Sequence, residues 1–375
     1  MAEFSVTPYE VQGTVDYGRL IQQFGLMPLD DATLKRLRKH AGELHYLLRR
    51  KIFFSHRDLG WLLNEFEKGN KFFLYTGRAP SGPIHLGHLV PWIFTKWLQD
   101  KFGAELWFQF PDEEKFLFKD NLTLEDTARY TRENMRDVIA LGFDPQKTHF
   151  LVDTMHAGLM YKEACKVAKL INFSTVKATF GFTNQTNIGS IFYTAMQAVP
   201  AFLPSVLAGK NVPCLIPLGA DQDVHFRVAR DAMGRLGYFK PAILHCQFLP
   251  ALTGPDSKMS SSAEHTAVYT TDDAKTVATK IKKYAFSGGR ATVDEHRKLG
   301  GNPDVDVSYQ WLRFLEPDDA KLQKIYEQYT SGTLLSGELK EILIETINAF
   351  LKSHQKKRAA AEKIIDKFIF PKEGV

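Results

Sequence analysis

Two histidines flank a glycine where a glycine- and proline-rich loop gives way to a helical pattern. The loop spans residues 77–83, and His85, Gly87 and His88 follow it. The N-terminus of a helix offers free backbone N–H groups and the positive end of the helix dipole, so it favours phosphate. A glycine lets a ligand approach the backbone, and imidazoles can donate to phosphate oxygens. These residues predict an anion site, although the pattern alone would equally suit two surface histidines.

A second cluster lies 170 residues further along the chain, after an apolar strand. Residues 256–262 are Asp-Ser-Lys-Met-Ser-Ser-Ser, with Lys258 as the cation. A lysine supplies a point charge to a leaving diphosphate, and serine N–H and O–H groups donate to its oxygens. A serine-rich segment alone is often a flexible linker. Its position after a strand, and its pairing with the histidine cluster, favour a mobile phosphate clamp.

The elements around these clusters predict an α/β fold. A short apolar run at 71–75 is typical of a buried strand, apolar residues recur at helical spacing over 86–98, and 104–110 is a second strand. Strand, loop, helix and strand make a βαβ unit. The same pattern continues with a helix at 123–141, strands at 148–152, 212–218 and 243–248, and a helix at 225–236. We predict a Rossmann-like, doubly wound parallel sheet with an insertion at about 156–210.

The pattern is different at both ends of the chain. Residues 1–70 are polar and charge-mixed, with one helix predicted from 30 to 50. From Thr271 onward the pattern is helical throughout, beginning with a capped start. Further helices are predicted at 304–316, 318–330 and 334–370. These changes predict an N-terminal appended layer, a catalytic domain and an all-helical C-terminal domain, at 1–70, 71–265 and 266–375.

Composition excludes several classes of protein. With 375 residues, 44% hydrophobic and 24% charged, the chain is neither disordered nor a single small module. Its net charge of +5 allows local contact with a polyanion but is far from that of a histone-like binder. Cys165, Cys214 and Cys246 form no C-x-x-C pair, so we expect no structural zinc or other metal site. The sequence has no secretory or transit signal and no membrane-spanning apolar stretch, which predicts a cytoplasmic protein with no membrane partner.

Together the two clusters resemble the signatures of class I aminoacyl-tRNA synthetases, His85-x-Gly-His88 and Lys258-Met-Ser-x-Ser262. Gly219-Ala-Asp-Gln222 resembles a motif shared by the tyrosyl and tryptophanyl branch. Six further segments are similar to the eukaryotic and archaeal tryptophanyl-tRNA synthetases: 73–78, 94–100, 112–115, 180–182, 214–217 and 285–290. The resemblance covers nearly the whole chain and is strongest from about 50 to 310.

The resemblance implies an ATP-dependent ligase for tryptophan and its tRNA, which forms tryptophanyl-adenylate and pyrophosphate before transferring tryptophan to the 3′ end of the tRNA. It also implies a homodimer and Mg²⁺ bound with ATP. The implied catalytic residues are His85, His88 and Lys258. The implied ATP site comprises Arg78, His85, Gly87, His88, Asp221, Lys258, Met259 and Ser260. The implied tryptophan site comprises Tyr75, Gln109, Glu114, Gln197 and Gln222, and Phe286 and Arg290 are the implied anticodon contacts.

Three other functions fit parts of this pattern. In a tyrosyl enzyme, an aspartate stands three residues after the glutamine of the Tyr-x-x-x-Gln motif. In this sequence the motif runs from Tyr193 to Gln197, and the residue at that position is Pro200, which has no side-chain acceptor for a phenol. A nucleotidylyltransferase also uses His-x-Gly-His, but it needs neither the 219–222 motif nor a helical domain. A catalytically silent paralogue would bind tRNA or protein without chemistry, and the intact histidines and lysine disfavour it.

Overall fold

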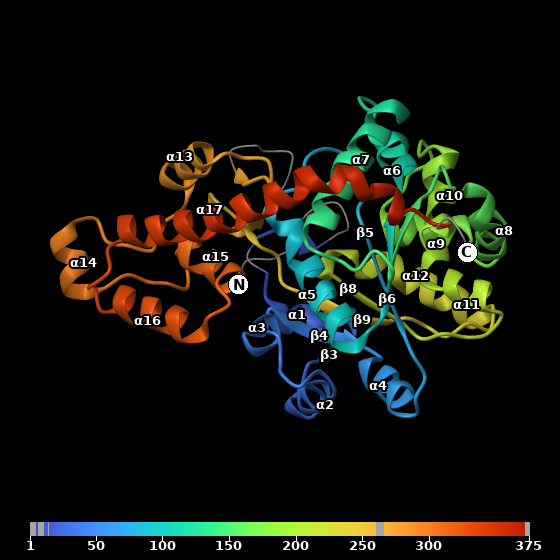
Figure 1. The fold of residues 1–375 in the computed structure, drawn as a ribbon, viewed down its shortest axis with the longest axis horizontal. Coiled ribbons are helices and arrows are strands. Elements are labelled where there is room, and N and C mark those ends of the chain that lie inside the picture. The colour runs from blue at the N-terminus through green and yellow to red at the C-terminus, as the bar shows by residue number, and fades with distance from the viewer. Residues whose placement is uncertain (1–4, 7–10, 14, 260–265, 372–375) are drawn as a thin grey trace.

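The computed structural model of the chain describes residues 5–6, 11–13, 15–259 and 266–371. A seven-stranded sheet forms the centre of one half of the molecule, with the strand order β3-β4-β9-β8-β5-β6-β7 (Figure 1). Its strands are β3 (Met27–Pro28), β4 (Phe53–Arg57), β5 (Phe73–Gly77), β6 (Glu105–Phe110), β7 (Thr148–Val152), β8 (Cys214–Gly219) and β9 (Ala242–Cys246). Two small hairpins accompany it, β1 (Ser5–Val6) with β2 (Val11–Gln12), and β10 (Pro250–Ala251) with β11 (Gly254–Lys258).

Strands β5 to β9 of the sheet are parallel, and β4 and β3 extend it in antiparallel fashion. The strand order reverses between β5 and β8, which is where doubly wound sheets bind ligands, beyond the carboxyl ends of their strands. The predicted fold class is therefore confirmed. The helices of this half are α1 (Tyr17–Phe24), α2 (Asp31–Ala41), α3 (Tyr46–Arg49), α4 (Leu59–Glu67), α5 (Leu86–Phe102), α6 (Asp112–Phe118), α7 (Leu124–Ala140), η2 (Ala220–Gln222) and α12 (Asp223–Arg235).

The two faces of the sheet bury different sets of side chains. Side chains alternate along a strand, so Leu74 and Leu106 pack with α5 and α7 on one face, whereas Tyr75 and Trp107 point to the other. That second face is covered by the insertion between β7 and β8. The insertion consists of α8 (Ala157–Ala168), α9 (Phe173–Phe180), α10 (Ile188–Met196), η1 (Val199–Ala201) and α11 (Leu203–Ala208). Polar side chains of β5 and β6 on this face are therefore brought beneath the insertion helices.

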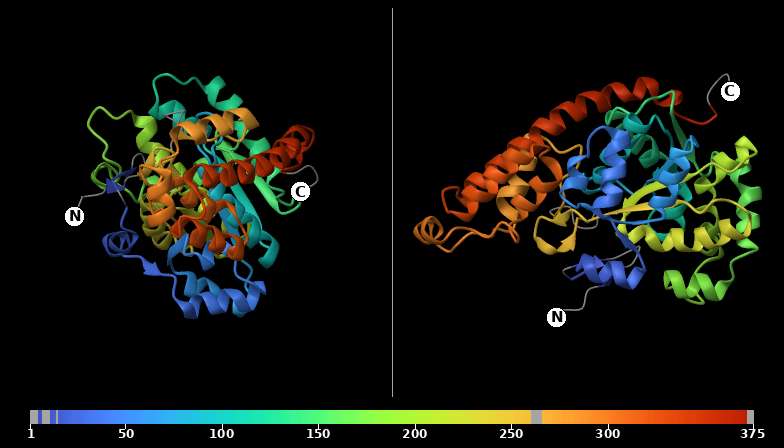
Figure 2. Two further views of the ribbon diagram at one scale, coloured as in Figure 1. Left: turned by 90° about the vertical axis from the view of Figure 1, so that its left-hand side faces the viewer. Right: turned by 90° about the horizontal axis from the view of Figure 1, so that it is seen from below.

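The C-terminal half is helical and extends to one side of the sheet (Figures 1 and 2). Its elements are α13 (Ala274–Tyr284), α14 (Val293–Leu299), α15 (Val307–Leu315), α16 (Asp319–Thr330), α17 (Ser336–Ala361) and η4 (Glu362–Lys367). The long helix α17 returns to the α/β half along α7 (Figure 1). A buried pair joins the two helices, because His354 Nε2 lies 2.9 Å from Asp137 Oδ1, and Arg358 Nε donates to the other oxygen at 3.2 Å.

After η4, residues 368–371 lie against the edge of the sheet. Phe150 N in β7 donates to Phe368 O at 2.6 Å, and Phe370 N donates to Phe150 O at 3.1 Å. The ring of Phe370 packs against Trp107 of β6, with centroids 4.9 Å apart. This tail covers the outer edge of β7, which would otherwise expose unpaired backbone groups.

The structure differs from the predicted elements in several places. The predicted helix 30–50 is two helices separated at Gly42, whose φ of +82° ends α2. Strand β4 and helices α1, α4, α6 and α14 were not predicted, and β4 ties part of the N-terminal segment into the central sheet. The predicted helix 334–370 stops at residue 361 and gives way to η4 and the paired tail. The serine-rich segment was predicted to be a loop, but its beginning lies in β11.

Candidate active site

Arg78 directly follows β5, and part of its guanidinium has no hydrogen-bond partner among the described residues. Its backbone N–H donates to Gln109 O at 2.9 Å, and its Nη1 donates to Ala79 O. Its Nε and Nη2 are buried and have no hydrogen-bond partner within the described part of the chain. Burial lowers the pKa of Arg78 to about 10, so the side chain is still a cation at neutral pH. A buried cation with two unused N–H donors is suited to receive an anion such as phosphate.

His85 and His88 form a stacked pair at the start of α5. His85 is the N-cap residue and is only 4% exposed. The two imidazole centroids are 3.6 Å apart, and the His85 N–H donates to His88 Nδ1 at 3.3 Å. A Cβ at Gly87 would lie 3.1 Å from atoms of the His85 ring, so the close fold of the ring over the helix start depends on a glycine there. The start of α5 therefore brings the two imidazoles together, while the Leu86 and His88 N–H groups already donate to Val268 O and His85 O.

The two clusters found in the sequence meet in space. A Cβ on Gly87 would lie 3.6 Å from the Cβ of Met259, which is itself buried. On the far side of the undescribed segment 260–265, Leu86 N donates to Val268 O at 3.0 Å, and Thr270 N donates to Ile84 O at 2.9 Å. Lys258 is the last residue of β11, and Ser260 lies outside the described residues. The backbone on both sides of the serine-rich segment thus packs against the loop before α5.

Three predicted tryptophan-site residues form one buried hydrogen-bonded cluster. Tyr75 and Gln109 come from neighbouring strands and are 1% and 0% exposed. The Tyr75 hydroxyl donates to Gln109 Oε1 at 2.5 Å. Gln197, just after α10, donates from Nε2 to the Tyr75 oxygen at 2.9 Å and to Gln109 Oε1 at 3.2 Å. Oxygen acceptors therefore gather where the carboxyl ends of β5 and β6 meet the insertion, as a ring N–H donor requires.

Glu114 supplies a negative charge next to this cluster. The Tyr193 hydroxyl donates to Glu114 Oε2 at 3.0 Å and also to Gln197 Oε1. Lys115 Nζ donates to Glu114 Oε1 at 2.5 Å. Burial alone would raise the pKa of Glu114, but Lys115, with help from His225 and Tyr193, holds that pKa below its usual value. An ionised, partly buried carboxylate of this kind suits a substrate ammonium group.

The remaining predicted residues follow β8 in a tight turn. A Cβ at Gly219 would lie 2.9 Å from Asp221 Oδ1, so a larger residue there would displace the Asp221 carboxylate. Asp221 is 7% exposed and Gln222 is half-buried, both in η2. The next residue, Asp223, accepts from Arg57 Nε and Nη2 at 2.8 Å each and lies 2.9 Å from His245 Nε2. This buried ionic cluster fixes the turn to β4 and β9.

Comparison with known proteins agrees with this geometry. Residues 67–352 match the sequence profile of the family described as "tRNA synthetases class I (W and Y)". A relative from Sulfolobus acidocaldarius named Tryptophan–tRNA ligase is 52% identical over 370 residues, which are 98% of this chain and 96% of the relative. The chain belongs to the class I tryptophanyl-tRNA synthetases. The family predicted from the two motifs is thus confirmed.

Two further matches support this membership. A Saccharomyces cerevisiae protein named "Tryptophan–tRNA ligase, cytoplasmic" is 46% identical, covering 98% of this synthetase and 89% of the relative. The crystal structure of Plasmodium falciparum tryptophanyl-tRNA synthetase matches with a TM-score of 0.90 at 40% identity, covering 94% of this chain and 97% of that one. The similarity therefore includes the helical half as well as the sheet.

The two predicted anticodon contacts of the synthetase lie on the surface of its helical half. Phe286 follows α13 and is 47% exposed, although its N–H donates to Leu252 O at 2.8 Å. Arg290 is also exposed, and its Nε donates to Gly300 O at 2.9 Å. An exposed aromatic ring and an exposed guanidinium are both side chains suited to contact an unpaired base. Their role in anticodon binding stays a prediction.

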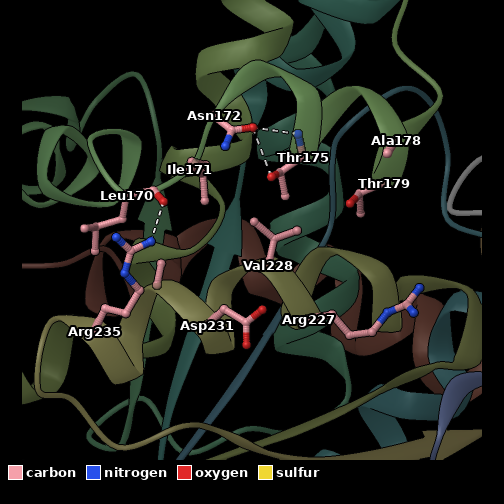
Figure 3. A pocket seen from close by; sticks show the side chains of 11 residues that line it. Leu170, Ile171, Asn172, Thr175, Ala178, Thr179, Arg227, Val228, Asp231 and Arg235 are labelled. Carbon is pink, nitrogen blue, oxygen red and sulfur yellow. Dashed lines mark hydrogen bonds between the residues drawn. The ribbon is translucent and has the colours of Figure 1, made fainter.

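An open cavity of about 500 Å³ lies elsewhere on the synthetase, between α9 and α12 (Figure 3). None of its lining residues belongs to the predicted site. Its polar groups are largely engaged: Arg235 donates to Leu170 O at 2.7 Å, Asn172 Oδ1 accepts from Thr175, and Arg227 lies 3.4 Å from Asp223. The predicted site residues lie instead around the carboxyl ends of β5, β6 and β8. Among the described residues, no three His, Cys, Asp or Glu side chains are grouped to hold a metal ion, and no helix is long and apolar enough to cross a bilayer.

Sequence analysis missed two acidic residues that support the site. Asp223 holds the turn that carries Asp221, and Asp153 accepts from Gln109 Nε2 at 2.7 Å. Each aspartate lies close behind a predicted strand, β8 and β7 respectively. Since ligands bind at the carboxyl ends of parallel strands, an acidic residue just after such a strand was the available signal.

Proposed function

We propose that this synthetase activates L-tryptophan with ATP and then transfers the tryptophan to the 3′ end of its tRNA. The observation that supports this proposal is that a cluster of hydrogen-bond acceptors and a buried cation lie near the carboxyl end of the same strand, β5. The Tyr75–Gln109–Gln197 cluster offers acceptors to a ring N–H, and Arg78, which follows the end of β5, keeps two buried N–H groups for an anion. Relatives named Tryptophan–tRNA ligase at about 50% identity over nearly the whole chain support tryptophan over tyrosine.

In the first step, a carboxylate oxygen of tryptophan attacks the α-phosphorus of ATP. The new O–P bond forms as the bond to the pyrophosphate oxygen breaks, so the products are tryptophanyl-adenylate and pyrophosphate. Glu114 binds the α-ammonium of the amino acid, and Tyr75 and Gln109 accept from the indole N–H. Because no protein nucleophile is required, the synthetase acts by positioning its substrates and neutralising charge.

The phosphate groups are held by residues from both motifs. The N-terminus of α5, with His85, Gly87 and His88, faces the phosphates, and Arg78 donates to them through Nε and Nη2. Lys258, Met259 and Ser260 form the clamp on the departing pyrophosphate, while Asp221 accepts from the ribose hydroxyls. If ATP is bound as its Mg²⁺ complex, the ion would supply further positive charge beside the phosphates that Arg78 and Lys258 hold.

In the second step, a hydroxyl of the terminal tRNA ribose attacks the carbonyl carbon of the adenylate, and AMP leaves. Residues 266–375 act as the anticodon-binding domain, with Phe286 stacking on a base and Arg290 donating to it. Residues 71–265 act as the catalytic domain, and residues 1–70 act as an appended layer that joins the central sheet through β3 and β4. The cytoplasm is the proposed location, in keeping with the name of the yeast relative.

A homodimer is the proposed assembly, formed through the insertion helices. This surface exposes large apolar side chains, including Ile188 at 84%, Tyr161 at 60% and Phe173 at 39%. A shallow groove between α8, α9 and α10 is lined largely by apolar residues. Exposed apolar surface of this kind is typical of an interface. Ile188→Lys should convert the dimer to a monomer in analytical ultracentrifugation, and a monomeric wild-type protein would contradict this assembly.

The activity is tested by amino-acid-dependent exchange of labelled pyrophosphate into ATP. This assay needs no tRNA and can be run against all twenty amino acids. Exchange with tryptophan alone is the expected result. Exchange with tyrosine would contradict the proposed pocket, and a folded, ATP-binding protein without exchange would support a catalytically silent paralogue.

A further inference from the structure

The side-chain amide of Gln109 is held in one orientation by a residue outside the proposed substrate contacts. Its Nε2 donates to Asp153 Oδ2 at 2.7 Å, and its Oε1 accepts from Tyr75 and Gln197. Asp153 is 1% exposed and follows β7, and its own N–H donates to Phe110 O at 3.1 Å. The amide is thus clamped between a carboxyl group on one side and the Tyr75–Gln197 pair on the other.

Asp153 lies beside a second acid, the half-buried Glu113 of α6. The Asp153 Oδ1 and Glu113 Oε2 atoms are both buried, and neither receives a hydrogen bond from another described group. Burial and the Glu113 charge raise the pKa of Asp153 well above its usual range, and burial raises the pKa of Glu113 to about 7. A proton shared between Asp153 Oδ1 and Glu113 Oε2 would satisfy both oxygens.

This arrangement leaves Asp153 able to present only an acceptor to Gln109. With the proton directed at Glu113, Asp153 Oδ2 is a carbonyl oxygen and requires a donor, so the Gln109 NH₂ must point toward it. The Gln109 oxygen must then point toward Tyr75 and the substrate cluster. If the amide turned over, its NH₂ would face a ring N–H, and the two donors would repel each other.

We propose that Asp153 is a positioning residue that fixes the Gln109 amide with its oxygen toward the pocket, and thereby makes the pocket select a substrate ring that carries an N–H donor. This inference rests on the proposed function, because it assumes that Gln109 meets the indole. Asp153 touches no substrate and acts only through Gln109. Nothing in the sequence motifs assigns it this role.

The test compares tryptophan with 3-(benzothien-3-yl)alanine, an analogue in which sulfur replaces the indole N–H. In the pyrophosphate exchange assay, Asp153→Ala should lower kcat/KM for tryptophan by about 10- to 100-fold, mainly through KM, because a buried donor loses its acceptor. Turnover of the analogue should change little, so the tryptophan-to-analogue ratio falls by a similar factor. KM for ATP should stay unchanged. Asp153→Asn should remain within about threefold of the wild type, since its amide can donate to Glu113 and its oxygen can accept from Gln109 as the protonated acid does.

Asp112→Asn is the matched control. Asp112 is the first residue of α6, next to Glu113, and it is buried. It accepts from Thr154 N at 3.0 Å and from Thr154 Oγ1 at 2.5 Å, and it makes no hydrogen bond with Gln109 within the described part of the chain. It should alter thermal stability without changing the substrate ratio. If Asp153→Ala does not fold, Asp153→Ser, whose hydroxyl is too short to reach Gln109, gives the same comparison. An unchanged ratio in the alanine or serine variant, or an asparagine variant as impaired as alanine, would overturn the inference. Absence of tryptophan-dependent exchange in the wild type would instead overturn the proposed function.

Discussion

Replacing Arg78 with methionine should have opposite effects on stability and on activity. Methionine is similar in length and apolar, so it fills the site without a charge. In the free protein, the Arg78 Nε and Nη2 groups are buried without partners in the described part of the chain, and the cation is costly to hold there. In the presence of ATP, the same groups are needed for phosphate. An ordinary core residue would show only a loss of stability.

The size of both effects follows from the structure. Burial lowers the pKa of Arg78 from 12.5 to about 10, which corresponds to a cost of at most roughly 3 kcal/mol for the charged form in the folded protein. Because the folded pKa is the lower one, this cost is fully present at every pH below about 10, including neutral pH. Removing the charge should therefore raise the melting temperature by several degrees. Two charge-assisted hydrogen bonds to phosphate contribute about 1.5–3 kcal/mol each, so kcat/KM for ATP should fall at least 100-fold.

Differential scanning fluorimetry and pyrophosphate exchange measure the two effects. ATP should raise the melting temperature of the wild type and leave that of Arg78→Met unchanged, since ligand binding stabilises only a protein that binds it. Arg129→Met is the control, because Arg129 lies on the exposed side of α7 with 62% of its side chain accessible. It should change neither quantity. A destabilised Arg78→Met with normal ATP kinetics would refute the assignment of this guanidinium to phosphate.

Three other outcomes are expected. Asp137→Ala should lower the free energy of unfolding by about 3 kcal/mol or more in urea titrations, because it leaves His354 and Arg358 without their buried partner. Glu362→Gln, at the exposed Arg132 pair, should change the free energy of unfolding little. Burial, with Arg49 and Arg50, lowers the pKa of His45 to about 4, so the melting temperature should fall as the pH is lowered from about 6.5 to 4. His45→Asn keeps an acceptor for Leu47 N and should make the melting temperature less dependent on pH in this range. Phe286→Ala and Arg290→Ala should each raise KM for tRNA in aminoacylation by about tenfold and leave tryptophan-dependent pyrophosphate exchange unchanged. Reduced exchange in either variant would contradict the assignment of these residues to the anticodon.

The scaffold could be predicted from sequence because local periodicity determines it. Strand β7 has the predicted bounds, and β5, β6, β8 and β9 lie within a few residues of theirs, since apolar runs ended by glycine or proline are local signals. Strand β4 was not predicted because it contains the polar residues Ser55 and Arg57, which are typical of a surface segment. Their partners, His245 and Asp223, lie more than 160 residues away in the chain. Tertiary pairing of this kind leaves no local pattern.

The positions of the site motifs could be predicted, but their connections could not. His85, Gly87 and Met259 are recognised by type and spacing, and the structure places them in contact. The paired acids Asp153 and Glu113 carry the opposite signal, because acidic residues in a sequence usually indicate solvent. Only their position beside a buried glutamine that itself needs an acceptor shows that their oxygens face the protein interior. This information depends on three separate segments, β6, α6 and the end of β7, coming together.

The two halves of the proposed site are prepared for their substrates in different ways. On the ATP side, Arg78 holds N–H groups that nothing in the described structure accepts, so phosphate gains their full hydrogen-bonding energy on binding. On the tryptophan side, Tyr75, Gln109 and Gln197 already bond to one another, so an indole N–H must share or replace an existing bond and gains only the difference. Binding on that side therefore depends on the fixed direction of the acceptors more than on the number of bonds formed. This arrangement favours selectivity for a ring with an N–H donor. A ring without a correctly placed N–H disturbs the hydrogen bonds of the cluster and forms no new hydrogen bond to replace them.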